Sequence, residues 1–284
     1  MKFVFKALDL LVSSNIYVSF GVLVLTWVSL DIRQLRCDDL LGFVFFSTLF
    51  IYNFIRLVRV HPMVMEGDSN RHKIIFRYRE LLWALSIVSG FIACYFFTSL
   101  YRSIWVYLLP MSIVSVTYVL PVYKTSFGHW VRLRDVPCLK IFLIAMTWAF
   151  VTEGLPSILS IDKVDSLALL ERFLFVFAIT IPFDIRDLHF DKMSLRTLPQ
   201  LFGPVGARRI GISALLVAEL ILAYRCFFEN SIDFWSGIVV YFTYEVSAFL
   251  VYKSHPNSKE RYVTLGVEGM CILMGVMYLL QKQL

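Results

Sequence analysis

The sequence predicts an all-α fold, a polytopic membrane protein whose nine transmembrane helices form one bundle. Composition gives the first indication, because 58% of the 284 residues are hydrophobic, only 17% are charged and the mean hydropathy is +0.72. The second is the recurrence of apolar runs near the roughly 20 residues that an α-helix needs to cross the hydrocarbon core. A transmembrane β-barrel would show shorter segments of alternating hydrophobicity instead. We therefore expect residues 1–284 to form a single integral membrane domain.

The nine spans follow from the apolar runs in chain order. Residues 10–30, 81–101 and 103–123 contain no charged side chain, so the first, third and fourth spans are well defined. Glu171 and Arg172 interrupt the sixth run and make it the weakest of the nine. The expected spans are 10–30, 39–59, 81–101, 103–123, 138–155, 166–184, 208–227, 233–252 and 263–281.

The distribution of basic residues predicts the orientation of the chain. With nine spans, most of the 27 lysines and arginines fall on the side that holds the N-terminus and the longer loops, such as 60–80 and 185–207. The opposite side holds only Arg33, Arg36, Arg102, Lys163, Arg172, Arg225 and Lys282. Since cytoplasmic loops carry an excess of Lys and Arg, we expect a multi-pass protein of the cytoplasmic (plasma) membrane with its N-terminus inside and its C-terminus outside.

Each of the last three spans contains one acidic residue, Glu219, Glu245 or Glu268. A carboxylate at the bilayer centre costs roughly 2.5–3.5 kcal/mol unless it is paired or protonated. Hydrogen bonds between helices, with Lys140 as one partner, or a position near the interface would account for these residues. A proton or ion path is the alternative, and the sequence does not decide between them.

Three aspartates at the end of the sixth span form the strongest candidate site. Asp184, Asp187 and Asp191 are spaced by three and four residues, so a continuous helix would place them on one face. Carboxylate oxygens, together with phosphate oxygens and water, are the ligands that Mg²⁺ prefers, and the neighbouring Arg186 and Arg196 suit an anionic substrate. The alternative is a solvated loop in which the acids pair with adjacent basic residues.

The stretch from Phe183 to Gly203 resembles the second aspartate-rich motif of the UbiA-type intramembrane prenyltransferases. That motif reads R-D-x-x-x-D, then a basic residue, R/K-T-L-P and a glycine, and Asp187 and Asp191 match its two acids. A weaker resemblance joins Leu120–Lys124 to the family segment Y-P-x-x-K, with Lys124 at the lysine. The nine-helix layout with long cytoplasmic loops after even-numbered helices is also that of the family.

The resemblance implies an activity and a set of ligands. A family member transfers an isoprenyl group from a polyprenyl diphosphate to an aromatic or other lipophilic acceptor. Asp187 and Asp191 would be the catalytic residues and would hold Mg²⁺ with Asp184 in support. Lys124, Arg186 and Arg196 would contact the substrate diphosphate.

The first aspartate-rich motif of the family, N-D-x-x-D-x-x-x-D at the end of the second span, is degenerate in this chain. Asn53 matches the leading asparagine, but the three aspartate positions hold Phe54, Leu57 and His61. The resemblance therefore implies one Mg²⁺ site rather than two.

Two arginines lie beside the lost motif, and three interpretations of them stay open. Arg56 and Arg59 could neutralise a diphosphate in place of the missing metal, with Asn53 and Arg56 as substrate contacts, since a guanidinium grips phosphate bidentately. They could instead bind a lipid headgroup or another anion without chemistry. They could also anchor the helix end on the basic side of the membrane.

These observations favour a UbiA-like prenyltransferase in contact with membrane lipids. The rival is a non-catalytic isoprenoid- or lipid-binding protein on the same scaffold, and a transporter is a weaker third option. Nucleic acid is not an expected partner, because a chain of this composition has no large soluble surface to bind it.

Overall fold

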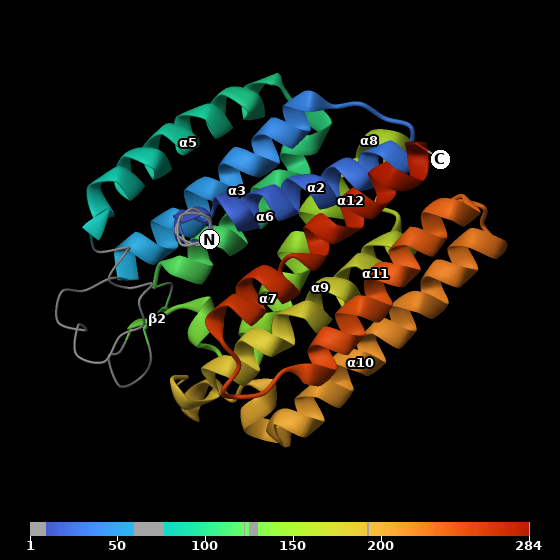
Figure 1. The fold of residues 1–284 in the computed structure, drawn as a ribbon. Coiled ribbons are helices and arrows are strands. Elements are labelled where there is room, and N and C mark those ends of the chain that lie inside the picture. The colour runs from blue at the N-terminus through green and yellow to red at the C-terminus, as the bar shows by residue number, and fades with distance from the viewer. Residues whose placement is uncertain (1–9, 60–76, 122, 125–129, 192, 284) are drawn as a thin grey trace. The chain divides into compact units, whose positions relative to one another are not determined.

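The computed structural model describes residues 10–59, 77–121, 123–124, 130–191 and 193–283, and this part of the chain is almost entirely helical (Figure 1). The α-helices are α2 (Ile16–Ile32), α3 (Asp38–Arg59), α5 (Arg79–Ser99), α6 (Arg102–Val119), α7 (Leu139–Ala149), α8 (Leu155–Ile161), α9 (Ser166–Arg186), α10 (Leu198–Phe227), α11 (Phe234–Lys253) and α12 (Met270–Gln283). Two short strands, β1 (Tyr123–Lys124) and β2 (Trp130–Val131), pair antiparallel.

Each of the nine predicted spans coincides with a helical segment, so the all-α fold class is confirmed. Among the described residues, seven segments are long and apolar enough to cross a membrane, α2 is a shorter apolar helix, and α6, which coincides with the fourth predicted span, is not among the seven. The fifth span is a composite in which the π-helical turn Phe150–Gly154 joins α7 to α8. A second π-helical turn, Tyr262–Val267, precedes α12 in the ninth span. The orientation of the termini stays a prediction.

The predicted loop 185–207 is wrong in its second half, because α10 begins at Leu198 rather than at 208. The side-chain oxygen of Gln200 accepts a hydrogen bond from the backbone N–H of Thr197 at 3.0 Å, which satisfies a donor at the helix start. Pro199 occupies the first turn, where its missing N–H costs nothing. The helix is then broken at Gly203, whose φ of 70° favours glycine.

The chain divides into two compact units, whose boundaries fall within α2, just after α2 and between α5 and α6. The N-terminal unit comprises residues 1–24 and 37–101, and the C-terminal unit comprises 25–36 and 102–284. In the N-terminal unit α3 packs along α5 (Figure 1). Aromatic pairs line this contact, for example Phe54 against Trp83 with ring centroids 6.1 Å apart.

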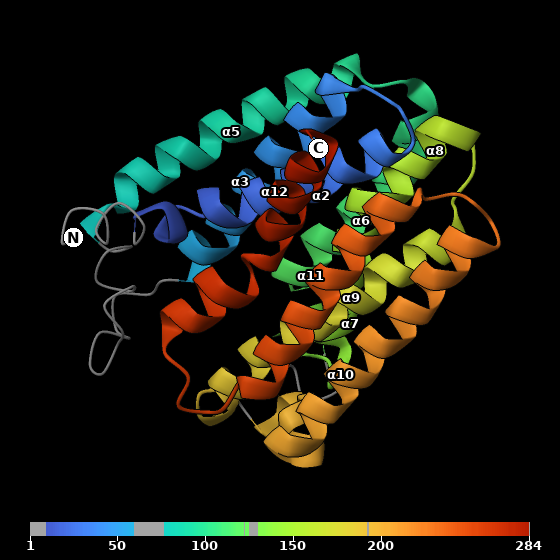
Figure 2. The same cartoon turned by 45° about the vertical axis from the view of Figure 1, so that its right-hand side comes forward.

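In the C-terminal unit α9 is the central helix and packs against α7, α10 and α11. Figure 2 shows α10 and α11 side by side, joined by a short connection. Gly211 allows the close approach of α10, since a Cβ there would lie 3.0 Å from Ile181 and 3.1 Å from Val251. Most of α9 is buried, which accounts for its long apolar run.

Candidate functional site

The candidate site is built where α9 ends. The expectation that Asp184, Asp187 and Asp191 share one helical face is wrong, because α9 stops at Arg186 and Asp187–His189 form a 3₁₀ turn. The backbone N–H of Asp191 donates to the carbonyl of Asp187 at 2.8 Å, so the chain folds back at this point. Asp184 alone lies on the buried face of α9, with 1% of its surface exposed.

Lys140 joins two of the three aspartates. Its ammonium donates to Asp184 Oδ1 at 2.8 Å and lies 3.6 Å from Asp191 Oδ2. The expectation that Lys140 pairs with an embedded glutamate is therefore wrong. Its partner is instead the carboxylate of Asp184, near the end of α9, and α7 packs against this helix (Figure 2).

The start of α7 is fixed to the segment that follows the aspartates. The backbone N–H of Cys138 donates to the carbonyl of Leu195 at 3.0 Å, and its Sγ–H donates to the carbonyl of Arg196 at the same distance. These bonds hold Lys140, two residues further on, at a defined place beside the cluster. Arg196 itself is exposed, so its backbone positions α7 while its side chain points away from the core.

Asp187 is engaged differently. Its two carboxylate oxygens accept hydrogen bonds from Arg186, one from Nε at 2.7 Å and one from Nη2 at 3.1 Å. The Arg186 guanidinium also lies over the Phe183 ring and within electrostatic reach of Glu268, one of the embedded acids. Arg186 and Asp187 thus neutralise each other beside the Lys140 cluster.

The three aspartates do not fit Mg²⁺ in this arrangement. Among the residues that the structure describes, no group of three or more His, Cys, Asp and Glu side chains is placed to hold a metal ion. Mg²⁺ needs oxygen ligands at about 2.0–2.1 Å in octahedral geometry. The Lys140 ammonium lies where such an ion would contact Asp184 and Asp191, and Asp187 is ion-paired with Arg186. The Mg²⁺ site implied by the resemblance stays a prediction, and we derive no step through it.

Arg134 is a member of the site that the sequence did not single out. It lies in the 3₁₀ turn Leu133–Asp135, and its guanidinium covers the Tyr118 ring at 5.7 Å. Its Nε and Nη1 atoms are buried and have no hydrogen-bond partner among the described residues, although Nε lies 3.9 Å from Asp135 Oδ1. Burial lowers the pKa of Arg134, against the opposing effect of the Asp135 and Asp191 carboxylates. A guanidinium nonetheless stays protonated at neutral pH, so these N–H groups are donors suited to an anion.

The predicted substrate contacts in the N-terminal unit have structural partners. Asn53 is fully buried, accepts a hydrogen bond from Asn15 and donates to the carbonyls of Ser14 and Leu49. Arg56 donates to the carbonyl of Ser13 at 2.7 Å. Both side chains therefore hold the segment before α2 against α3.

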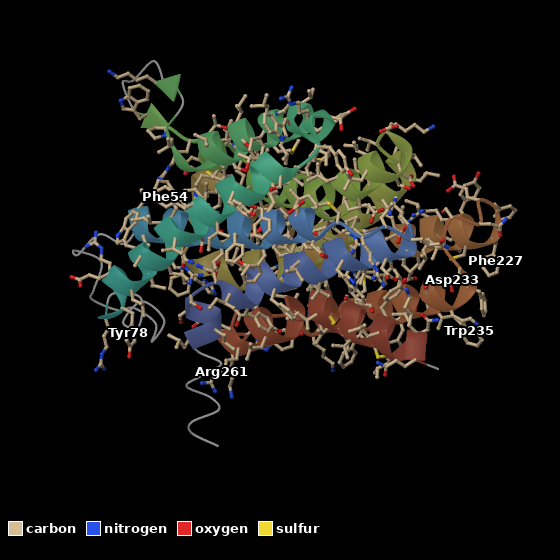
Figure 3. The ribbon with its side chains drawn as sticks, turned by 90° about the horizontal axis from the view of Figure 1, so that it is seen from above. Phe54, Tyr78, Phe227, Asp233, Trp235 and Arg261 are labelled. Atoms are coloured by element: carbon tan, nitrogen blue, oxygen red, sulfur yellow. The ribbon has the colours of Figure 1, made fainter. Side chains whose placement is uncertain are left out.

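The lost first motif has become part of an apolar contact. Phe54 packs on Trp83, and Leu57 is buried beside Leu82 and the same Trp83. Figure 3 labels Phe54 on α3. His61 and the side chain of Arg59 lie outside the described residues. Lys124, on β1 of the C-terminal unit, is exposed.

The sequence also missed a network of buried charges within the apolar helices of the C-terminal unit. Glu153, on the π-helical turn, lies 2.5 Å from Arg33 and 3.4 Å from Arg172, and it accepts a hydrogen bond from Ser29. Glu171 accepts hydrogen bonds from Arg225 at 2.5 Å and from Tyr244 at 2.8 Å. The sequence signal that could have revealed this network is a set of isolated arginines, Arg33, Arg172 and Arg225, on the side predicted to hold few basic residues.

Comparisons with known proteins bear on the fold. The sequence matches no family model, and no curated protein matches it in sequence. The structure is similar to the apo structure of a UbiA homolog from Aeropyrum pernix K1, with a TM-score of 0.67 and 14% sequence identity. The match covers 94% of this chain and 98% of the other. At this identity the likeness shows the fold, so the chain is a multi-pass membrane protein with the UbiA-type fold that residues 183–203 predicted.

Proposed function

We propose that this protein binds a polyprenyl diphosphate within the membrane and transfers its isoprenyl group to an aromatic or other lipophilic acceptor. The observation that carries the proposal is the cluster at the end of α9 in a UbiA-type fold. There the Asp184 and Asp191 carboxylates and the Lys140 ammonium lie in the electrostatic field of Arg134, whose Nε and Nη1 have no hydrogen-bond partner among the described residues. Fold alone would not be enough, since one fold can host unrelated functions.

The transfer requires that the bond between C1 of the isoprenyl chain and the diphosphate oxygen breaks heterolytically. The electron pair leaves with the diphosphate, an allylic cation remains, and the acceptor attacks C1 and loses a proton. Donors that are fixed in place before the reaction stabilise the charge that develops on the leaving group. Arg134 would supply such donors through Nε and Nη1, and Arg186 would supply its Nη1, which is also buried without a hydrogen-bond partner among the described residues.

Asp191 would take the acceptor proton in this proposal. Its Oδ2 atom is buried and accepts no hydrogen bond from a described residue, although Lys140 lies 3.6 Å away. Asp187 would act by holding Arg186 in position, given their two hydrogen bonds. Lys124 and Arg196, both exposed, would meet the diphosphate only as it enters from the aqueous side.

Calorimetric titration of geranylgeranyl diphosphate into detergent-purified protein tests the binding half of the proposal. We expect saturable binding to one site, weakened at least tenfold by Arg134→Ala. Asp162→Asn is a matched control, because Asp162 is exposed at the end of α8 and Asn tolerates its φ of 54°. If farnesyl, geranylgeranyl and longer diphosphates all fail to bind, the proposal is wrong.

A non-catalytic isoprenoid-binding protein is the second candidate. The observation in its favour is that the first motif offers no carboxylate, and that Asn53 and Arg56 bind backbone carbonyls in the N-terminal unit. This candidate predicts saturable binding without release of pyrophosphate in the presence of any acceptor.

A further inference from the structure

We propose that Lys140 is the resident cation of the Asp184–Asp191 pair, so that this site binds a diphosphate without a divalent metal. The proposal rests on the proposed function for the identity of the anion. It departs from the Mg²⁺ site that the aspartate motif implies, because the chain itself supplies a cation to the same carboxylates.

The geometry places one ammonium against two carboxylates from different segments. Asp184 comes from the last turn of α9, Asp191 from the segment beyond the 3₁₀ turn, and Lys140 from the first turn of α7. The Asp184 side chain is 2% exposed and the other two are 18–20% exposed, so all three lie mainly out of water. Removing one member of such a set would leave a buried charge without a partner, which is strongly unfavourable.

The position of Lys140 is set by backbone contacts, so the contact does not depend on the flexible side chain alone. Cys138 has a φ of 60° and is bonded through its N–H to Leu195 and through its thiol to Arg196. Two hydrogen bonds from Cys138 therefore join the start of the helix that carries Lys140 to the segment after Asp191.

Charge balance excludes an additional divalent cation beside Lys140. The negative charges of Asp184 and Asp191 are met by the ammonium and by the nearby Arg134 guanidinium, which acts electrostatically on Asp191. A Mg²⁺ ion would have to take the Asp184 Oδ1 oxygen that lies 2.8 Å from Lys140 Nζ. A Mg²⁺ ion bound to that oxygen at about 2.0–2.1 Å would lie close to the ammonium, and two neighbouring cations repel strongly in a medium of low dielectric constant.

Binding of Mn²⁺, measured by electron paramagnetic resonance on protein in nanodiscs without substrate, tests the proposal directly. We expect no stoichiometric site in the wild type. Lys140→Met should gain one site, because it frees two carboxylates, and adding Asp184→Asn should remove that site again. Lys163→Met is the matched control, because Lys163 is exposed in the connection before α9, and it should bind no Mn²⁺.

Two results of the Mn²⁺ measurement would overturn the proposal. One is a stoichiometric Mn²⁺ site in the wild type that Asp184→Asn abolishes. This result does not depend on whether Lys140→Met folds. The other is a folded Lys140→Met protein that gains no site.

Geranylgeranyl diphosphate should also bind the wild type with a Kd that changes less than twofold between EDTA and Mg²⁺. A tightening of more than tenfold by Mg²⁺ would contradict the proposal, whereas failure of the diphosphate to bind at all would contradict the proposed function and leave the Mn²⁺ result valid.

Discussion

Lys140 and Asp184 illustrate, at the scale of single residues, how a charged group is tolerated at the end of an apolar helix. The sequence singled out Asp184 as a metal ligand but did not predict its pairing with Lys140, which lies 44 positions earlier in the chain. The ion pair forms because α7 packs on α9 and places the two side chains 2.8 Å apart. A buried carboxylate of this kind is stable only while its partner remains.

Substitution of Asp184 by Asn should lower the free energy of unfolding in detergent by about 3 kcal/mol, the low end for breaking a buried ion pair. The physical reason is that Lys140 would keep only the more distant contact with Asp191. Chemical denaturation monitored by circular dichroism measures the change. Asp162→Asn, at an exposed position, should stay within about 0.5 kcal/mol of the wild type. Equal effects of the two substitutions would show that the Lys140 pair does not stabilise the fold.

Arg134→Ala and Arg134→Lys should each weaken geranylgeranyl diphosphate binding about tenfold or more, since a hydrogen bond to a charged group contributes about 1.5–3 kcal/mol. Lysine should fail to rescue binding, because it lacks the planar fork and the stacking on Tyr118. Calorimetry of the variants measures the effect. Arg132→Lys is the control, because Arg132 is 39% exposed and pairs with Asp135. Unchanged affinity in Arg134→Ala would remove Arg134 from the binding site.

At the scale of elements, two ion-paired groups lock the apolar helices of the C-terminal unit together. Glu171 on α9 bonds to Arg225 on α10 and to Tyr244 on α11, so one carboxylate links three helices. Glu153 is placed by a π-helical turn, a local widening that often marks sites with a special role. These charges are buried and paired, which is the condition for charge inside a membrane protein.

The single substitutions Glu171→Met and Arg225→Met should each destabilise the protein by about 3 kcal/mol, whereas the double variant should lose less than the sum. An apolar pair of similar volume often replaces a buried ion pair at little cost, while a lone buried charge cannot be accommodated. A double-mutant cycle of unfolding free energies gives the coupling. Glu229→Met, in the exposed turn after α10, serves as the control. Additive effects of the two substitutions would rule out a coupled pair.

The start of α11 gives a pH-dependent prediction outside the membrane-spanning segments. The Asp233 carboxylate accepts hydrogen bonds from the backbone N–H groups of Trp235 and Ser236, each at 3.1 Å, and Figure 3 shows Asp233 and Trp235 at this end of the helix. Burial raises the pKa of Asp233, but hydrogen bonds from the Ser236 side chain and from these two backbone N–H groups outweigh it, and the pKa lies below its usual value. The carboxylate therefore stabilises the folded state above the unfolded pKa of about 3.9.

Asp233→Ala should accordingly cost about 1 kcal/mol at neutral pH. The difference from the wild type should shrink as the pH falls from about 4 through the lowered pKa of the folded state. Thermal unfolding at several pH values measures it, and Asp162→Asn controls for the loss of a surface charge, because Asn tolerates the φ of 54° at that position. A difference that stays constant down to the lowest accessible pH would contradict the capping role.

The sequence predicted the helices well and the site only in part, for physical reasons that differ. Uncharged runs such as 81–101 must be helical in a bilayer, so their positions follow directly from composition. The start of α10 was missed because Arg196 and Thr197 look like loop residues, whereas they lead into a capped helix. Arg134 was missed because its burial depends on the packing of Tyr118 from another helix.

At the scale of the whole molecule, each compact unit exposes large apolar side chains, as expected for a protein surrounded by lipid. Phe91 on α5 is 74% exposed and Leu220 on α10 is 71% exposed. Patches of such residues on a soluble monomer would mark an interaction surface. In this protein the exposed apolar residues suit contact with lipid, so we expect chemistry at the polar clusters near the helix ends. This agrees with a diphosphate that enters from the aqueous side while its tail lies in the membrane.

The most direct test of this account is the release of pyrophosphate from geranylgeranyl diphosphate by purified protein in nanodiscs, with and without a panel of phenolic and quinol acceptors. We predict release that depends on an acceptor, and a loss of at least tenfold in Asp191→Asn with Asp162→Asn unchanged. Binding without release for every acceptor and chain length, or equal release by Asp191→Asn, would contradict the proposed transfer reaction.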